Sequence, residues 1–275
     1  MNRIAIGAAV AALGLAAAVA LPTITTTPPP ASAQADEASE EFVPERPGQI
    51  EDPGRPSFNT GGWTTDFSIS SVPFNEIFSG GPGKDGIPAI DEPQFESIDD
   101  ARPWVTGQGP VISLEIDGDA RAYPLSVLTW HEIVNDTVGD EPVIVTFCPL
   151  CHTALVFERE LDGTVHDFGV SGNLRLSDMV MYDRQTETWW QQATGLGIVG
   201  ELTGAKLDFV PSQLISLDQF AEAYPDGQVL SRDTGYGRDY GRNPYVGYDT
   251  IDQQPFLFAG VTDGRLSPKE RVVTL

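Results

Sequence analysis

The sequence is poor in sulfur, in histidine and in positive charge. Its 275 residues include two cysteines, three methionines and three histidines, and 16 Lys and Arg stand against 40 Asp and Glu. The resulting net charge of −24 disfavours nucleic acid as a partner, because the phosphate backbone is bound mainly through Lys and Arg. Such acidity instead favours solubility in an extracytoplasmic or salty medium.

Long helical patterns are also scarce, whereas 28 glycines and 22 prolines are present. This composition predicts a mainly β fold, with α+β as the alternative, in the form of antiparallel sheets or a barrel-like domain with one or two short helices. β-Branched runs around Asp-Gly turns predict two hairpins, over residues 111–123 and 153–170. Short helices are predicted over residues 124–130 and 216–224, and an aromatic loop over residues 235–248.

The N-terminus has the organisation of an export signal. Arg3 precedes an apolar run over residues 4–21, and small residues near 31–35 offer cleavage sites, so residues 1–35 are interpreted as a signal peptide. We therefore expect an extracytoplasmic protein, whether periplasmic, secreted or at the cell surface, with membrane contact only if this segment stays uncleaved. We expect residues 36–57 to form a flexible leader. Residues 58–275 are expected to form the folded domain.

The only two cysteines follow a β-branched run. Residues 143–147 predict a buried strand, and Cys148, Cys151 and His152 come directly after it. Two thiols at this spacing can bind a soft metal, exchange with other disulfides, close a disulfide or carry a haem. The strand would hold both thiols in a fixed geometry, so the candidate chemistry of the chain is placed here.

We favour a soft-metal site for Cu or Zn. Cys148 and Cys151 would form it, and His131 or His152 would complete it as an imidazole ligand. Cu(I) would be held by the two sulfurs alone or together with the thioether of Met181. The simplest interpretation of Met181 by itself is a core side chain.

Three alternatives stay open for the same cysteines. One is a non-catalytic domain with a structural disulfide formed after export. Another is a thiol-disulfide redox protein with a redox partner, although the strand-helix alternation of thioredoxin-like proteins is absent. The third is covalent haem at Cys148–His152, with Met181 or His131 as the distal ligand, which the β-rich surroundings disfavour.

Other polar residues have weaker signals, and no catalytic residue is assigned. His131 with Glu132, and Asp178 with Asp183, would suit acid-base work if they faced one pocket. Asp178 and Asp183 are predicted to make hydrogen bonds in turns, which is the usual role of aspartate between short strands.

A set of short motifs resembles a known family. In chain order they are Ala122 to Leu125, Trp130 to Asp136, Phe147 to Cys151, Gly169 to Gly172, Asp178 to Asp183, Arg238 to Tyr240 and Asn243 to Tyr245. Their succession is similar to the DUF3179 domain, a family of unknown function, over roughly residues 60–275. In that family the chain often continues through a second segment similar to the first hairpin, so residues 271–275 would be its opening strand and this chain a truncated or divergent member.

Overall fold

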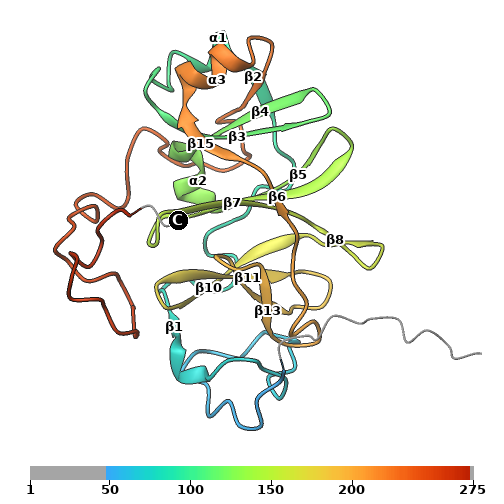
Figure 1. The fold of residues 1–275 in the computed structure, drawn as a ribbon. Coiled ribbons are helices and arrows are strands. Elements are labelled where there is room, and N and C mark those ends of the chain that lie inside the picture. The colour runs from blue at the N-terminus through green and yellow to red at the C-terminus, as the bar shows by residue number, and fades with distance from the viewer. Residues whose placement is uncertain (1–47, 273–275) are drawn as a thin grey trace, which may run out of the picture. The chain divides into compact units, whose positions relative to one another are not determined.

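Residues 48–272 are described by the structure, which is a computed structural model. The predicted signal peptide, most of the predicted leader and the end of the predicted C-terminal strand lie outside the described residues. The prediction of a mainly β fold is confirmed: the described residues form three larger sheets, a two-stranded ribbon, three short α-helices and a 3-10 helix (Figure 1). The sheets are open, so the barrel-like form is not the one adopted by this part of the chain.

The first sheet has the strand order β15-β3-β4-β16-β2, and its pairs are antiparallel except β4 with β16. Its strands are β2 (Phe95–Ser97), β3 (Pro110–Ile116), β4 (Asp119–Pro124), β15 (Gln213–Ser216) and β16 (Gln228–Leu230). The first predicted hairpin is β3–β4. Its turn residues Asp117 and Gly118 both have positive φ, at 51° and 89°, as a tight two-residue hairpin turn requires.

The second sheet is antiparallel, with the order β14-β7-β6-β5. Its strands are β5 (Ile133–Val138), β6 (Glu141–Cys148), β7 (Thr153–Glu158) and β14 (Phe209–Val210). The predicted strand over residues 143–147 lies within β6, and residues 143–148 are all buried. Its continuous apolar run is therefore explained by burial on both faces.

The third sheet is antiparallel, with the order β1-β10-β11-β12-β13. Its strands are β1 (Ile77–Ser79), which follows the 3-10 helix η1 (Phe74–Glu76), and then β10 (Phe168–Arg175), β11 (Asp178–Asp183), β12 (Trp189–Gln191) and β13 (Leu196–Val199). The second predicted hairpin is wrong. Only β8 (Glu160–Leu161) and β9 (Thr164–Val165) pair across its turn, while β7 and β10 belong to different sheets.

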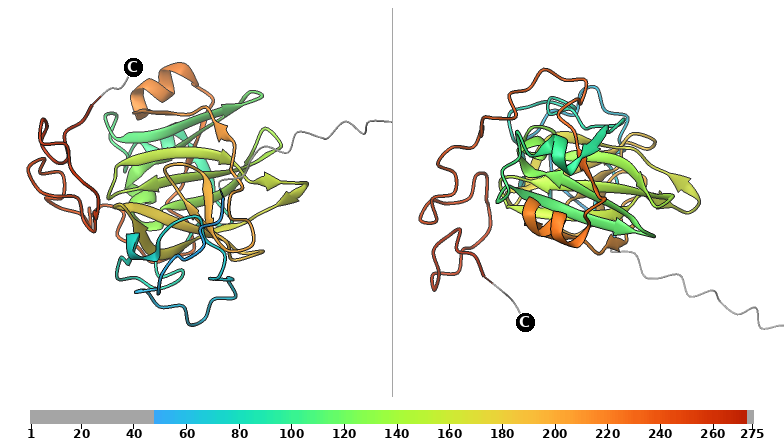
Figure 2. Two further views of the ribbon diagram at one scale, coloured as in Figure 1. Left: turned by 60° about the horizontal axis from the view of Figure 1, so that its bottom comes forward. Right: turned by 90° about the horizontal axis from the view of Figure 1, so that it is seen from above.

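The three sheets are stacked, and an apolar cluster fills each interface (Figures 1 and 2). One cluster joins the first sheet to the second, and another, which contains Cys148, joins the second sheet to the third. The outer face of the first sheet packs against α1 (Ile98–Ala101) and α3 (Leu217–Ala223), and the outer face of the third against residues 58–74. A middle sheet covered on both faces accounts for the unbroken apolar sequence of β6.

The short helices begin where the sequence provides a start signal. In α2 (Leu125–His131), Pro124 occupies the N-cap position with φ −63°, and in α3 Ser216 and Gln219 form a capping box. Both predicted helices are confirmed to within one residue at each end. No helix within residues 48–272 has the combination of length and hydropathy that a membrane span requires.

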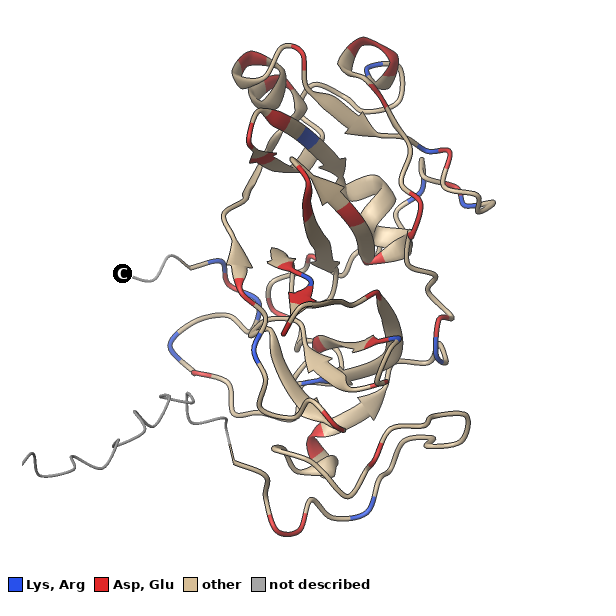
Figure 3. Cartoon of the chain, turned by 90° about the vertical axis from the view of Figure 1, so that its right-hand side faces the viewer, with Lys and Arg blue, Asp and Glu red and all other residues tan. Residues whose placement is uncertain are grey.

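Both ends of the described chain lack regular structure yet contact the domain. Near the start, the amide of Ile50 donates to the carbonyl of Ser70 at 2.9 Å. After β16, residues 231–272 form no strand or helix, and the predicted aromatic loop is part of this C-terminal segment (red in Figure 1). Tyr240 packs against the first core cluster, and the hydroxyl of Tyr248 donates to the carbonyl of Leu150 at 2.9 Å. Acidic residues occur in many parts of the described chain rather than in one patch of sequence (Figure 3).

Candidate metal centre

The two cysteines lie on the turn that joins β6 to β7. Cys148 is the last residue of β6 and is paired with Thr153, the first residue of β7. The turn closes through His152, whose φ is 54°. Cys148 is buried with 1% exposure, Cys151 is half-buried, and both thiols are free. The strand pairing therefore fixes the position of both sulfur atoms, as expected from the buried strand before them.

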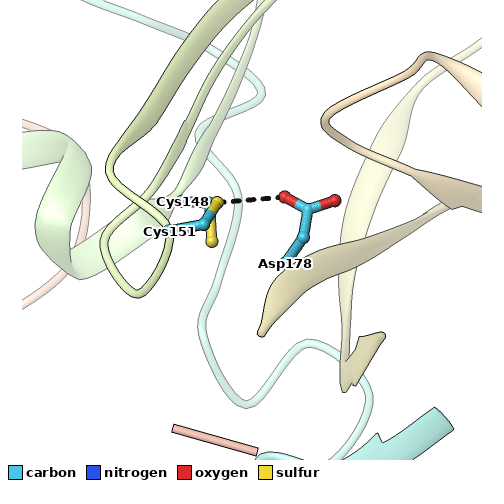
Figure 4. Close-up of side chains that lie close together, drawn as sticks. All are labelled: Cys148, Cys151 and Asp178. Atoms are coloured by element: carbon cyan, nitrogen blue, oxygen red, sulfur yellow. Dashed lines mark hydrogen bonds between the residues drawn. The ribbon is translucent and has the colours of Figure 1, made fainter. Parts of the chain in front are cut away.

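A carboxylate from the third sheet faces these thiols. Asp178 is the first residue of β11, and it follows a tight turn at Leu176 and Ser177, which have φ values of 54° and 67°. Its Oδ1 lies 3.2 Å from the Sγ of Cys151 (Figure 4). The two sulfurs and a carboxylate oxygen all lie within 4.8 Å of one another, a group that can hold one metal ion.

Neighbouring groups hold Asp178 in place. Its Oδ2 accepts a hydrogen bond from the amide of Ala193 at 2.9 Å and a second from the Nε2 of Gln191. On the other side, the hydroxyl of Thr153 lies 3.0 Å from the Sγ of Cys151. Partners of this kind orient the ligands of a metal and tune their basicity.

The cluster carries acidic groups that have no cationic partner. Burial raises the pKa of Cys148 well above its ordinary value, and the negative charges of Cys151, Asp178 and Glu132 raise it further. Burial also raises the pKa of Asp178. Within residues 48–272, no Lys, Arg or His forms an ion pair with Asp178 or Glu132. Ionised, these groups would need a bound cation, since buried charges are otherwise strongly unfavourable.

Glu132 is an unusual residue beside the cluster. It caps the C-terminus of α2 with φ 61° and ψ −30°, a conformation that a non-glycine residue rarely adopts. Its side chain is buried, and burial raises the pKa of its carboxyl to about 8, with the charge of Asp178 adding to the effect. The phenol of Tyr245 lies beside this carboxyl, and burial together with Glu132 raises the pKa of that phenol. Backbone strain of this kind is often found at functional sites.

Two hollows adjoin the cluster. The smaller is a cavity of about 320 Å³ lined by Glu132, Met179 and Tyr245 among others. The larger is a groove of about 1040 Å³ lined by Cys151, His152, Ser177 and residues of the C-terminal segment. Both have walls formed by Tyr245 and by Tyr248. The half-buried thiol of Cys151 is thus reached along the groove, and the buried carboxyl of Glu132 is reached from the cavity.

The histidines predicted as ligands do not belong to the cluster. The Nδ1 of His131 lies 2.7 Å from the carbonyl of Pro88, and its Nε2 lies 2.7 Å from the hydroxyl of Tyr240. Because burial lowers the pKa of His131, its ring is neutral, so Nδ1 donates to the carbonyl and Nε2 accepts from the phenol. His152 instead packs edge-on against Phe147, with ring centroids 5.7 Å apart.

Met181 lies in the apolar cluster that also contains Cys148 and Met179, and all three are buried. Asp183 fulfils the turn prediction, because its Oδ1 accepts from the amide of Thr186 at 2.7 Å. Asp178 does not. The sequence placed Asp178 in a turn between short strands, which gave no indication that it lies opposite the cysteines.

The fold and the cluster define a mainly β protein with a buried thiol and carboxylate centre. Residues 84–275 match the family described as "Protein of unknown function (DUF3179)", and the chain belongs to this family. No curated protein and no solved structure matches the chain. The resemblance inferred from the motifs is confirmed.

Proposed function

We propose that this protein binds Zn(II) through Cys148, Cys151 and Asp178. The observation that carries the proposal is the convergence of two thiols and one carboxylate within 4.8 Å. Among residues 48–272, no Lys or Arg forms an ion pair with this carboxylate. Binding a dication removes the electrostatic cost of ionising all three ligands, because they lose their protons as the metal enters. Export, as expected from residues 1–35, would place this centre outside the cytoplasm.

The spacing of the ligands suits a tetrahedral ion. With Zn–S near 2.3 Å and Zn–O near 2.0 Å, tetrahedral geometry puts a sulfur and an oxygen about 3.5 Å apart. The Sγ of Cys151 and the Oδ1 of Asp178 are 3.2 Å apart, so a small adjustment of side chains admits the ion. The backbone carbonyl of Ser177 lies 3.8 Å from the Sγ of Cys148. The hydroxyl of the same residue is buried and has no hydrogen-bond partner within residues 48–272, a feature that calls for an explanation such as a further group at the site.

The carboxylate favours Zn(II) over Cu(I). Cu(I) prefers thiolate and thioether, whereas Zn(II) accepts sulfur and carboxylate oxygen in the same site. Met181 is a buried side chain of the apolar core cluster. Three protein ligands leave a fourth position for water or a substrate, as in catalytic zinc sites.

A thiol-disulfide exchange function has less support from the geometry. Exchange requires a thiolate, and a lowered thiol pKa is the usual mark of an exchange cysteine. The N-terminal cysteine of the pair, Cys148, is buried and its pKa is raised instead. The same burial limits the reach of a protein redox partner to Cys151.

The test is metal analysis of protein purified without a metal-binding tag, followed by competition with a chromogenic chelator. We expect about one equivalent of zinc in the unmodified protein, and an affinity loss of more than about 100-fold for Cys148→Ala and for Asp178→Asn, since loss of a direct ligand exceeds the effect of a second-shell change. Asp140→Asn, at an exposed turn with φ 67°, is the matched control and should behave like the unmodified protein.

Two outcomes would contradict the proposal. Unmodified protein that carries no metal, and that takes up neither zinc nor cobalt(II) after mild reduction, excludes the centre. Asp178→Asn could bind zinc as well as the Asp140→Asn control while Cys148→Ala binds it only weakly. In that case the two sulfurs alone form the site, and Cu(I) becomes the expected metal in place of Zn(II). Cobalt(II) adds a direct readout, because thiolate ligands give it a characteristic charge-transfer absorption.

A further inference from the structure

The cavity of about 320 Å³ next to the proposed centre has a chemistry of its own. Most of its wall is apolar and comes from the domain, including Ile87, Val170, Leu174 and Met179. Glu132 is the one charged residue among those that line it. Its volume is at the lower end of the range for small-molecule sites, so a compact ligand fits.

The charge around the cavity is negative once the Glu132 carboxyl and the proposed metal ligands are ionised, and it stays negative with a metal bound. Cys148, Cys151 and Asp178 as ionised ligands carry three negative charges, and a bound Zn(II) leaves one of them uncompensated. Glu132 adds another, and it forms no ion pair within residues 48–272. A buried negative field of this kind attracts a cationic ligand and rejects an anionic one.

The C-terminal segment contributes aromatic rings to the same cavity. Tyr245, Tyr248 and Phe256 line it, and the rings of Tyr245 and Tyr248 lie 6.4 Å apart between centroids. One of these rings already holds an ammonium group, because the Nζ of Lys269 lies 4.0 Å from the centroid of Tyr248. Aromatic faces beside a carboxylate are the usual means of binding organic ammonium groups.

We propose that this cavity binds a small organic cation of the alkylammonium class. Its ammonium group would lie at the Glu132 carboxylate beside Tyr245, and its alkyl part would pack against Val170, Leu174 and Met179. The proposal does not depend on the metal, because Glu132 is not one of the proposed zinc ligands and forms no ion pair within residues 48–272. The strained backbone of Glu132, held at the end of α2, keeps the carboxyl directed at the cavity wall.

The test is isothermal titration calorimetry of the full chain with three probes of matched length: n-butylammonium, n-butanol and butyrate. Each titration is run at pH 9, above the pKa of about 8 of the Glu132 carboxyl, once with chelator and once with zinc. We expect n-butylammonium to bind in both conditions, n-butanol at least about tenfold more weakly, and butyrate not at all, because a charge-assisted hydrogen bond is lost in the first case and charges of like sign meet in the second.

Two variants separate the carboxylate from the apolar cavity. Glu132→Gln keeps the size of the side chain and should weaken n-butylammonium binding at least about tenfold while leaving n-butanol binding unchanged. Glu222→Gln, on the exposed face of α3, is the control and should bind as the unmodified protein does. The unchanged affinity for n-butanol also shows that the Gln variant is folded around the cavity.

The proposal is overturned if n-butylammonium and n-butanol bind equally, if Glu132→Gln binds the amine as the control does, or if no probe binds. Binding of butyrate in preference to the amine overturns it as well. Failure of the metal proposal is seen separately, since it concerns zinc content and leaves amine binding in chelator intact.

Discussion

Glu132 gives a stability prediction whose sign is the opposite of the usual one for a carboxylate. Its pKa is about 8 in the folded protein against an ordinary value of 4.5, so between these pH values the native state holds a proton that the unfolded state has lost. Stability is then greatest at low pH and falls as the pH rises from about 4.5 to about 8. Glu132→Gln removes this titration.

The size of the effect follows from the two pKa values. At about 1.4 kcal/mol per pKa unit, the metal-free protein loses roughly 3 kcal/mol of unfolding free energy at pH 7 through Glu132, and roughly 1 kcal/mol at pH 5. We therefore expect Glu132→Gln to be more stable than the unmodified protein by roughly 3 kcal/mol at pH 7 and by only roughly 1 kcal/mol at pH 5.

The assay is urea unfolding followed by tryptophan fluorescence at pH 5, 6, 7 and 8, with chelator present. Other titrating groups are common to both proteins, so the difference in unfolding free energy isolates Glu132. Glu222→Gln, which changes an exposed glutamate, should show no difference that varies with pH. A difference between Glu132→Gln and the unmodified protein that stays constant from pH 5 to 8 would refute the reasoning, because the carboxyl would then not be held protonated by burial.

Two further predictions concern residues that close the site. Gly172→Ala should destabilise the protein by roughly 2–4 kcal/mol in urea unfolding, because its Cβ would lie 2.1 Å from the carbonyl oxygen of Pro82 at a φ of +78°. Gly163→Ala has the same φ and open space around it, so it should lose only about 1 kcal/mol, and equal losses would contradict the steric argument. Tyr240→Phe removes the hydroxyl that His131 accepts from, so we expect a loss of about 1–3 kcal/mol and faster proteolysis within residues 235–272; an unchanged cleavage rate would show that this hydrogen bond does not hold the segment.

Local patterns were sufficient for much of the secondary structure. The Asp117–Gly118 turn set the register of β3 against β4, and Ser216 and Gln219 set the start of α3, because these signals act between residues that are close in the chain. The second hairpin failed for the converse reason. Its flanking segments belong to different sheets, because β7 pairs with β6 and β14 whereas β10 pairs with β1 and β11, and no local signal encodes that choice.

The candidate centre likewise has a part that follows from the sequence and a part that follows only from the tertiary structure. The sequence by itself determined that Cys148 and Cys151 follow a buried strand, and it made the histidines near them the natural ligands to expect. Only the tertiary structure decided that Asp178, 27 residues beyond Cys151 and in another sheet, faces the thiols, whereas His131 turns to Pro88 and Tyr240. When two sheets stack, the residues on their facing sides come into contact. Which sides face each other depends on packing over the whole domain rather than on spacing along the chain.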